Sequence, residues 1–229
     1  MREIVMDTET TGLEANGGDR IVEIGGVELI NHLPTGRTYH QYINPERAMP
    51  REAFEVHGLG DDFLRDQPVF ERIADDFLAF IGDAKLVIHN ASFDMAFLNA
   101  ELARVGQPPL PMDQAIDTLD IARRKFPGAQ ASLDALCKRF GVDNSAREKH
   151  GALLDSEILA EVYLELLGGR QQGLTLASGA EQTTESHDAA EWQAPPRPKP
   201  LSPRLTDDER AAHQAFVAEL GDAALWHQT

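Results

Sequence analysis

Carboxylates stand at positions where apolar residues are expected, and this placement restricts the fold more than any other feature. The stretch 151–167, GALLDSEILAEVYLELL, has the spacing of an amphipathic helix. Asp155 falls in line with Leu159, Val162 and Leu166, on the face that should be buried. A charged side chain in a protein interior requires a partner, because it loses its hydration there. The fold must therefore bring such a partner to Asp155.

Two other predicted elements carry misplaced carboxylates. Asp7 and Glu9 follow the strand-like EIVMD, and alternation along the strand points them to the same protein-facing side as Val5. Asp94 lines up with Leu98 on the apolar stripe of the helical pattern SFDMAFLNAELARV. An acidic pair alone would indicate a solvated strand end, and a lone aspartate would indicate a helix cap or an ion pair. Together, these placements predict a shared site.

A cluster of carboxylates favours a metal site, because like charges repel. Two unit charges 4 Å apart repel by about 1 kcal/mol in water and by about 4 kcal/mol at an effective dielectric constant of 20. A divalent cation offsets this repulsion, and all-oxygen ligation suits Mg²⁺ or Mn²⁺ rather than zinc. The arrangement that fits phosphodiester chemistry is a pair of ions about 3.5–4 Å apart.

His150 stands just ahead of Asp155, in the motif HGALLD. Five residues correspond to about 140° around an ideal helix, so the two side chains cannot share a helix face. His150 is therefore expected in the loop VDNSAREKH or in the first helical turn, near the metals but not among their ligands. An imidazole can gain or lose a proton near neutral pH, which suits this residue to take a proton from an attacking water. If it stood alone, a surface histidine beside Lys149 would be the better interpretation.

The order of the predicted elements indicates an α/β fold. Strand-like segments at 3–7, 20–30 and 37–43 form an antiparallel meander, and later strands are expected at 85–90 and 115–118. Helical patterns occur at 50–64, 69–81, 92–105, 119–125, 131–140 and 151–167. This order predicts a mixed sheet with helices on its faces. Gly25 and Gly26 interrupt the second strand and indicate a bulge or a close backbone approach.

The net charge of −17 argues against a free-standing nucleic-acid binder, which usually has a basic face. A function on DNA or RNA must therefore explain how the substrate is held. Cys137, the only cysteine, lies in an apolar pattern and is expected to be a reduced core residue. Because the chain has no signal-peptide pattern and no apolar run of membrane-spanning length, we expect a cytoplasmic protein without membrane contact.

Three motifs, DTET, HNASFD and HGALLD, occur in this order. They resemble the exonuclease motifs of the DEDD superfamily, and the spacing between His150 and Asp155 resembles its histidine subgroup. Within this subgroup the chain is similar to the proofreading subunits of bacterial replicative DNA polymerases, from Arg2 to about Gly169. The resemblance implies a ribonuclease-H-like mixed sheet flanked by helices. It also implies 3′→5′ removal of mispaired nucleotides from single-stranded or frayed DNA ends, as deoxynucleoside monophosphates.

The resemblance also implies roles for individual residues. The ligands of two divalent cations, Mg²⁺ or Mn²⁺, would be Asp7, Glu9, Asp94 and Asp155, with His150 as general base. The pocket of the terminal nucleotide would be lined by Thr8, Thr10, Gly12, Leu13, His57 and Phe93. His89 is expected to support the site from a strand end, and Asn90 either to cap the following helix or to touch substrate. Candidate phosphate contacts are Arg123, Arg124, Lys125, Arg147 and Lys149.

After residue 170 the sequence changes character. Residues 171–203 are polar, with five prolines between Pro195 and Pro203, and predict an extended, flexible linker. Thr206 and Glu209 then match a capping box that begins a helix at 206–220. We therefore expect an exonuclease domain at 1–170, a linker at 171–203 and a docking segment at 204–229.

The tail resembles the partner-binding segments of the proofreading subunits. The peptide 172–176, with Gln172, Leu174 and Leu176, resembles a motif for the beta sliding clamp, and the alternative is a polar linker that contains two leucines. The last helix resembles a segment that binds the polymerase alpha subunit, and its expected anchors are Phe216, Leu220 and Trp226.

Two competing functions remain open from sequence. An RNA-trimming exonuclease, such as a relative of oligoribonuclease or ribonuclease T, would lack the Pro-rich linker and the docking helix. A non-catalytic module that bridges clamp and polymerase would not need the intact set of four carboxylates and a histidine. The chain has the linker and the docking helix, and it has the complete set of four carboxylates and a histidine. The proofreading function is therefore favoured over both alternatives.

Overall fold

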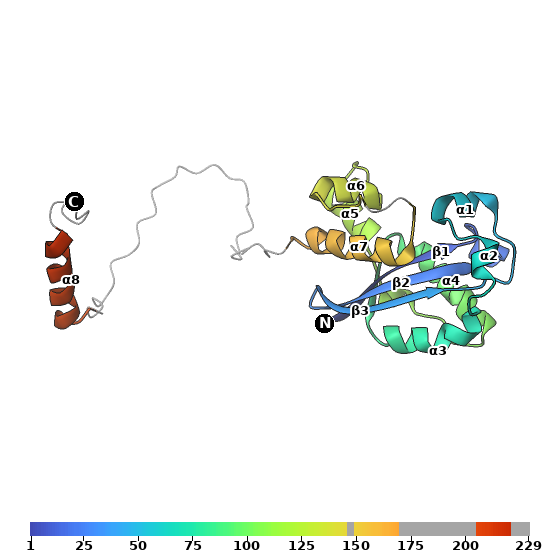
Figure 1. Ribbon diagram of the computed structural model, residues 1–229, viewed down its shortest axis with the longest axis horizontal. Helices are drawn as coiled ribbons and strands as arrows, with labels where there is room; N and C mark the ends of the chain where they lie inside the picture. Colours follow the sequence, from blue (N-terminus) through green and yellow to red (C-terminus); the bar gives the residue numbers. More distant parts are fainter. Residues whose placement is uncertain (146–148, 170–204, 221–229) are drawn as a thin grey trace, which may run out of the picture. The chain divides into compact units, whose positions relative to one another are not determined.

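The computed structural model describes residues 1–145, 149–169 and 205–220, and the first part of the chain is built on a five-stranded mixed sheet in the order β3-β2-β1-β4-β5 (Figure 1). The strands, in chain order, are β1 (Arg2–Thr10), β2 (Ile21–Ile30), β3 (Leu33–Tyr42), β4 (Lys85–Ile88) and β5 (Ala115–Asp117). The pairs β1–β2 and β2–β3 are antiparallel, whereas β1–β4 and β4–β5 are parallel. The predicted mixed sheet is confirmed.

Helices cover both faces of this sheet (Figure 1). One face carries α3 (Phe70–Ile81) and α4 (Ala91–Arg104), and the other carries α7 (Ala152–Leu166), on which α5 (Thr118–Lys125) and α6 (Leu133–Phe140) pack. Alternate residues of β1 supply both cores: Ile4 and Met6 join the cluster of α3 and α4, and Val5 joins that of α7. β1 is therefore buried on both faces, which explains its continuous apolar run.

The helical pattern predicted at 50–64 is two helices, so this expectation is wrong in detail. α1 (Arg51–His57) stops at Gly58, whose φ of +77° is a left-handed conformation that favours glycine, and α2 (Asp61–Leu64) follows. β3 also begins earlier than the predicted residue 37, because Asn31 and His32, both with positive φ, form a tight turn after β2. Two 3₁₀ turns, η1 (Ala15–Gly17) and η2 (Met112–Gln114), complete the domain.

Gly25 allows α7 to approach β2 directly. A Cβ atom built at Gly25 would overlap the main chain of Ala152 and Leu153, at the start of α7. In the same place the Ser156 hydroxyl donates a hydrogen bond of 3.1 Å to the Gly25 carbonyl. The close backbone approach is therefore found at Gly25, whereas the register shifts of β2 fall elsewhere in the strand.

The C-terminal helix α8 (Asp207–Leu220) begins at the predicted capping box. The Thr206 hydroxyl accepts from the Glu209 N–H, and the Glu209 carboxylate accepts from the Thr206 N–H. The chain divides into two compact units, 1–176 and 177–229. The predicted linker, the clamp-like peptide 172–176 and Trp226 lie outside the described residues. Within the ranges that are described, no helix combines the length and the apolarity needed to cross a membrane.

Replacing Gly25 by alanine should lower the free energy of unfolding by about 1 to 3 kcal/mol, because α7 must shift to admit the methyl group. Gly26→Ala is the matched control, since a Cβ there lies 3.3 Å from a side-chain atom of Phe80 rather than on main chain. We expect its effect to stay below about 1 kcal/mol. Urea unfolding of both variants checks this, and equal losses would contradict the role given to Gly25.

Candidate active site

The four predicted carboxylates, from three elements, meet in one pocket of about 560 Å³, which Asp134 of α6 also lines. Asp7 and Glu9 come from the end of β1, Asp94 from the first turn of α4, and Asp155 from the first turn of α7. Glu9, Asp94 and Asp155 are buried, and Asp7 is partly exposed. The structure thus brings together the four predicted carboxylates, and His150 lines the same pocket.

Asp94 and Asp155 are the most buried members of this cluster. The Thr8 hydroxyl, from the neighbouring position on β1, donates a hydrogen bond of 2.7 Å to the Asp94 carboxylate. Burial raises the pKa of Asp94 to about 7, with the Asp117 carboxylate acting in the same direction and the Thr8 hydrogen bond opposing it. A bound cation would favour the charged form of this carboxylate, so the donor set fits a hard divalent ion.

His150 lies closer to the carboxylates than its place in the sequence indicated. Its Nδ1 is 3.3 Å from Oδ2 of Asp155, and its side chain is 49% exposed. Glu9, His150 and Asp155 each offer one ligand atom, and these atoms lie within 4.8 Å of one another. An ion could therefore be held either by carboxylates alone or with help from the imidazole. The all-oxygen set stays a prediction.

Asp117 is an organising residue that the sequence reasoning missed. Its carboxylate accepts from the N–H groups of Asn90 (3.1 Å), Ala91 (3.1 Å) and Leu119 (2.8 Å), so one side chain caps both α4 and α5. Asn90 occupies the N-cap position of α4, as expected, but its side chain makes no capping hydrogen bond. A usable signal was the position of Asp117 at the end of β5: parallel β4 and β5 bring their carboxyl ends together.

His89 stands at the end of β4, where it was expected. Its Nδ1 lies 3.0 Å from the Thr118 hydroxyl, at the start of α5. Burial lowers the pKa of this imidazole, and the Asp117 carboxylate opposes the shift. His89 therefore links the β4 end to the same junction of α4 and α5 that Asp117 organises.

A second pocket, of about 690 Å³, adjoins the carboxylates. The two pockets share Thr8, Glu9, Phe93 and His150. The second is lined by the six residues predicted for the terminal nucleotide, namely Thr8, Thr10, Gly12, Leu13, His57 and Phe93. Pro50, Ala53 and Val56 line it as well and were missed, since nothing in the pattern of α1 distinguished these positions from an ordinary helix face.

His57 presents a buried nitrogen beside this second pocket. Its Nδ1 accepts from the Leu59 N–H at 3.0 Å, so a neutral ring carries its proton on Nε2. Within the described part of the chain, Nε2 has no hydrogen-bond partner. Burial lowers the pKa of His57, with the Thr10 main chain opposing the shift, so the neutral form is favoured.

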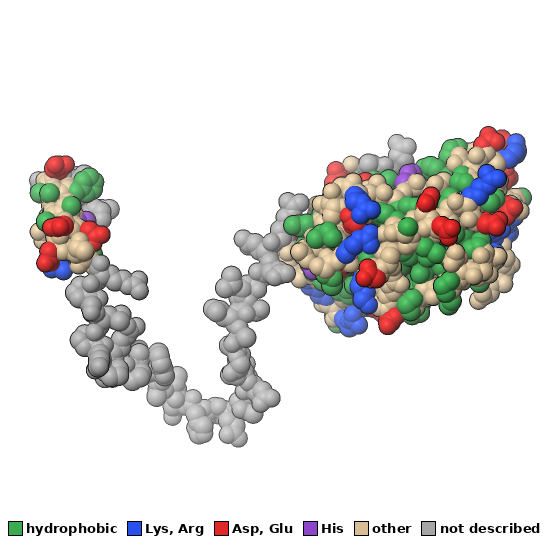
Figure 2. Space-filling model, turned by 90° about the horizontal axis from the view of Figure 1, so that it is seen from below, with side chains coloured by type: hydrophobic (Ala, Val, Ile, Leu, Met, Phe, Trp, Pro, Cys, Tyr) green, Lys and Arg blue, Asp and Glu red, His purple; other side chains and the backbone are tan. Residues whose placement is uncertain are grey.

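The predicted phosphate contacts separate into different roles. Arg123 lines the carboxylate pocket, and Arg124 lines a neighbouring one. Lys125 instead donates to the carbonyls of Glu165 and Leu166 at the end of α7, which is a structural contact. Arg147 lies outside the described residues. On the face that Figure 2 shows, Lys and Arg are interspersed with Asp and Glu instead of forming a broad basic surface.

Comparison with known proteins links this site to a family. A family model described as "Exonuclease" matches residues 4–163. The chain is 48% identical over 225 residues to a DNA polymerase III subunit epsilon of Rickettsia felis, covering 96% of this chain and 97% of that protein. It is 42% identical over 236 residues to a DNA polymerase III subunit epsilon of Escherichia coli (strain K12), covering 98% and 97% respectively.

Solved structures are similar to part of the chain. Exonuclease X in complex with 5′ overhanging duplex DNA is 26% identical, with a TM-score of 0.54 over 72% of this chain and 90% of that one. The nuclease domain of 3′hExo, a DEDDh family member bound to rAMP, is 21% identical, with a TM-score of 0.64 over 72% and 91%. The second likeness shows the fold.

Replacing Asp94 by asparagine should raise the free energy of unfolding in EDTA by about 1 to 3 kcal/mol, because it removes a buried charge from among carboxylates. Asp62→Asn is the matched control, since the Asp62 side chain is 98% exposed and should change stability little. Adding Mn²⁺ should then stabilise the wild type more than Asp94→Asn. Denaturant unfolding with and without the metal checks both statements, and a loss of stability in EDTA would contradict the charge argument.

Proposed function

This chain belongs to the exonuclease family, in the group of DNA polymerase III epsilon subunits, and we propose that its two adjoining pockets carry out the proofreading reaction of such a subunit. The chain is a 3′→5′ exonuclease. The observation that supports the assignment of the site is the junction of a carboxylate pocket with a largely apolar one, through Thr8, Glu9, Phe93 and His150. A terminal nucleotide in the apolar pocket would thus place its phosphate at the carboxylates.

The family is typically metal-dependent. We propose two divalent cations, Mg²⁺ or Mn²⁺, held by Asp7, Glu9, Asp94 and Asp155. The buried carboxylates and the raised pKa of Asp94 support this set. When bound, the ions would lower the pKa of a ligated water and offset the charge on the attacked phosphate.

The chain's own residues hold the substrate and move the proton. Leu13, Val56 and Phe93 would contact the terminal nucleoside in the second pocket, and His57 would form part of the pocket wall. His150 would accept the proton of the attacking water, because its ring is half-exposed and lines both pockets. The new P–O bond forms to the water oxygen, the bond to the 3′ oxygen of the preceding nucleotide breaks, and that oxygen takes up a proton from solvent as a deoxynucleoside monophosphate leaves.

A tether would replace a basic surface as the means of holding DNA. With a net charge of −17, the protein gains little from binding phosphates on its own. Attachment to a polymerase that already holds the 3′ end would raise the effective concentration of that end. We propose that Phe216, Leu220 and Trp226 contact the alpha subunit. We propose also that Gln172, Leu174 and Leu176 contact the beta sliding clamp, which would place the protein with the replication machinery in the cytoplasm.

Asp7→Ala should lower the rate of nucleotide removal from a mismatched DNA end by more than about 100-fold, because the proposed site loses a metal ligand. Asp62→Ala, at an exposed carboxylate, should act like the wild type. A nuclease assay on mismatched ends, paired ends and short RNA, with Mn²⁺ or EDTA, checks the rate and the preference. Near-wild-type activity of Asp7→Ala would refute the site, and a preference for RNA would favour the RNA-trimming alternative.

Phe216→Ala should weaken binding to the polymerase alpha subunit by about 30-fold, since Phe216 is exposed and would be an interface anchor. Glu219→Ala, on the same helix, is the control and should change affinity by no more than about twofold. Surface plasmon resonance with the alpha subunit measures both. Nuclease activity of the free subunit should be unchanged in each case, and unchanged affinity of Phe216→Ala would remove this anchor from the tether.

A further inference from the structure

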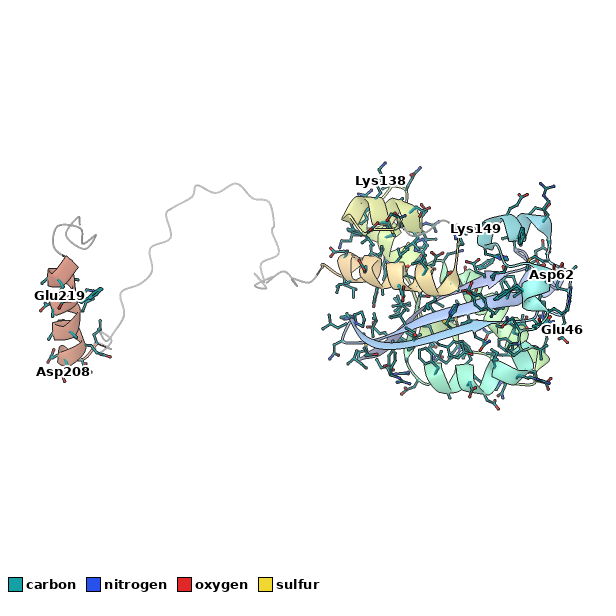
Figure 3. All side chains as sticks on the ribbon, in the orientation of Figure 1. Glu46, Asp62, Lys138, Lys149, Asp208 and Glu219 are labelled. Atoms are coloured by element: carbon teal, nitrogen blue, oxygen red, sulfur yellow. The ribbon has the colours of Figure 1, made fainter. Side chains whose placement is uncertain are left out.

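Lys149 and His150, which stand just before Gly151 and α7, are both attached to α1. The His150 N–H donates to the Val56 carbonyl at 3.3 Å. The ammonium group of Lys149 lies 5.1 Å from the centre of the Phe54 ring, within the range of a cation–π interaction. Figure 3 shows Lys149 between α1 and the first turn of α7. Two consecutive residues before α7 are therefore held by the same helix.

Glycines make room for this contact. A Cβ atom at Gly58 would lie 2.8 Å from Cδ and 3.0 Å from Nζ of Lys149, so any side chain there would displace the lysine. A Cβ atom at Gly60 would lie 3.3 Å from the Phe54 ring. The Lys149 side chain therefore packs at the end of α1, against the Phe54 ring and against the backbone of Gly58, which has no side chain.

Other roles for Lys149 are less well supported. Among the residues that the structure describes, Lys149 forms no ion pair, although Glu52 and Glu55 lie on α1. The lysine therefore has the Phe54 ring as its partner rather than a carboxylate. It does not line either pocket of the site, which argues against a direct phosphate contact.

α1 is also a wall of the pocket proposed for the terminal nucleotide. Ala53, Val56 and His57 line that pocket, whereas Phe54 receives Lys149. One short helix therefore contacts both the proposed binding site of the nucleoside and the residues that precede the proposed general base. A change in how Lys149 packs on α1 would alter the position of His150, while Ala53, Val56 and His57 would keep their places in the pocket wall.

We propose that Lys149 is a positioning residue. Its contact with the Phe54 ring holds Lys149 and His150 on α1 and so keeps the imidazole of His150 at the carboxylates. The inference rests on the proposed role of His150 as general base. Because the cation–π contact is exposed, its loss should be a small but measurable effect on the chemical step, about two- to fivefold.

The test measures single-turnover cleavage of a single-stranded oligonucleotide by the full chain in Mn²⁺, over a range of DNA and salt concentrations. Lys149→Met and Phe54→Leu should each lower the rate at saturating DNA by about two- to fivefold, with the half-saturating DNA concentration unchanged. The double variant should be no slower than the slower single variant, since both remove one contact. Lys149→Arg and Phe54→Tyr keep the charge and the ring and should restore the wild-type rate.

Lys138→Met is the matched control, because Lys138 is an exposed lysine on α6, away from α1 (Figure 3). It should behave as the wild type. A higher half-saturating DNA concentration for Lys149→Met, with weaker salt dependence and an unchanged saturated rate, would show a phosphate contact and overturn the proposal. Wild-type rates for Lys149→Met would overturn it too. An inactive wild type would instead refute the proposed function, so the two failures are distinguishable.

Discussion

The mutual repulsion of four carboxylates at the end of β1 is the constraint around which this domain is built. Asp7, Glu9, Asp94 and Asp155 come from three elements and line one pocket. Two contacts bring these elements together. Gly25 admits the main chain of α7 directly onto β2, and Asp117 caps α4 and α5 at the ends of the parallel strands. Neither contact is catalytic, yet each sets the place of a carboxylate-bearing helix.

The same arrangement explains how an acidic protein can act on DNA. Part of the negative charge, the carboxylates of Asp7, Glu9, Asp94 and Asp155, lies where a divalent cation would offset it. The pocket proposed for the nucleoside is largely apolar, with Leu13, Ala53 and Val56 among its lining residues, and so would require little basic surface. Affinity can then come from attachment to a polymerase, which supplies the 3′ end at a high local concentration.

The sequence predicted the elements and the carboxylates well, and the contacts between elements less well. Asp155 was visible because a carboxylate broke an apolar stripe, and the capping box of α8 because it is a local pattern. The helix α1 ends after His57 because Gly58 has a positive φ, and the spacing of apolar residues does not predict such a backbone angle. The double capping by Asp117 depends on which strands become neighbours. The contact of Lys149 with the Phe54 ring joins a loop and a helix that are far apart in the chain, so no local pattern predicts it.

The ligand set is the central claim, because two donor sets are geometrically available. Crystals of the full chain soaked in Mn²⁺, with diffraction data collected at the manganese absorption edge, would locate the metal directly. We expect two anomalous peaks, bound only by oxygen atoms of Asp7, Glu9, Asp94, Asp155 and water. A single peak held by Glu9, Asp155 and a ring nitrogen of His150 would contradict the account, because that nitrogen could not then serve as the base.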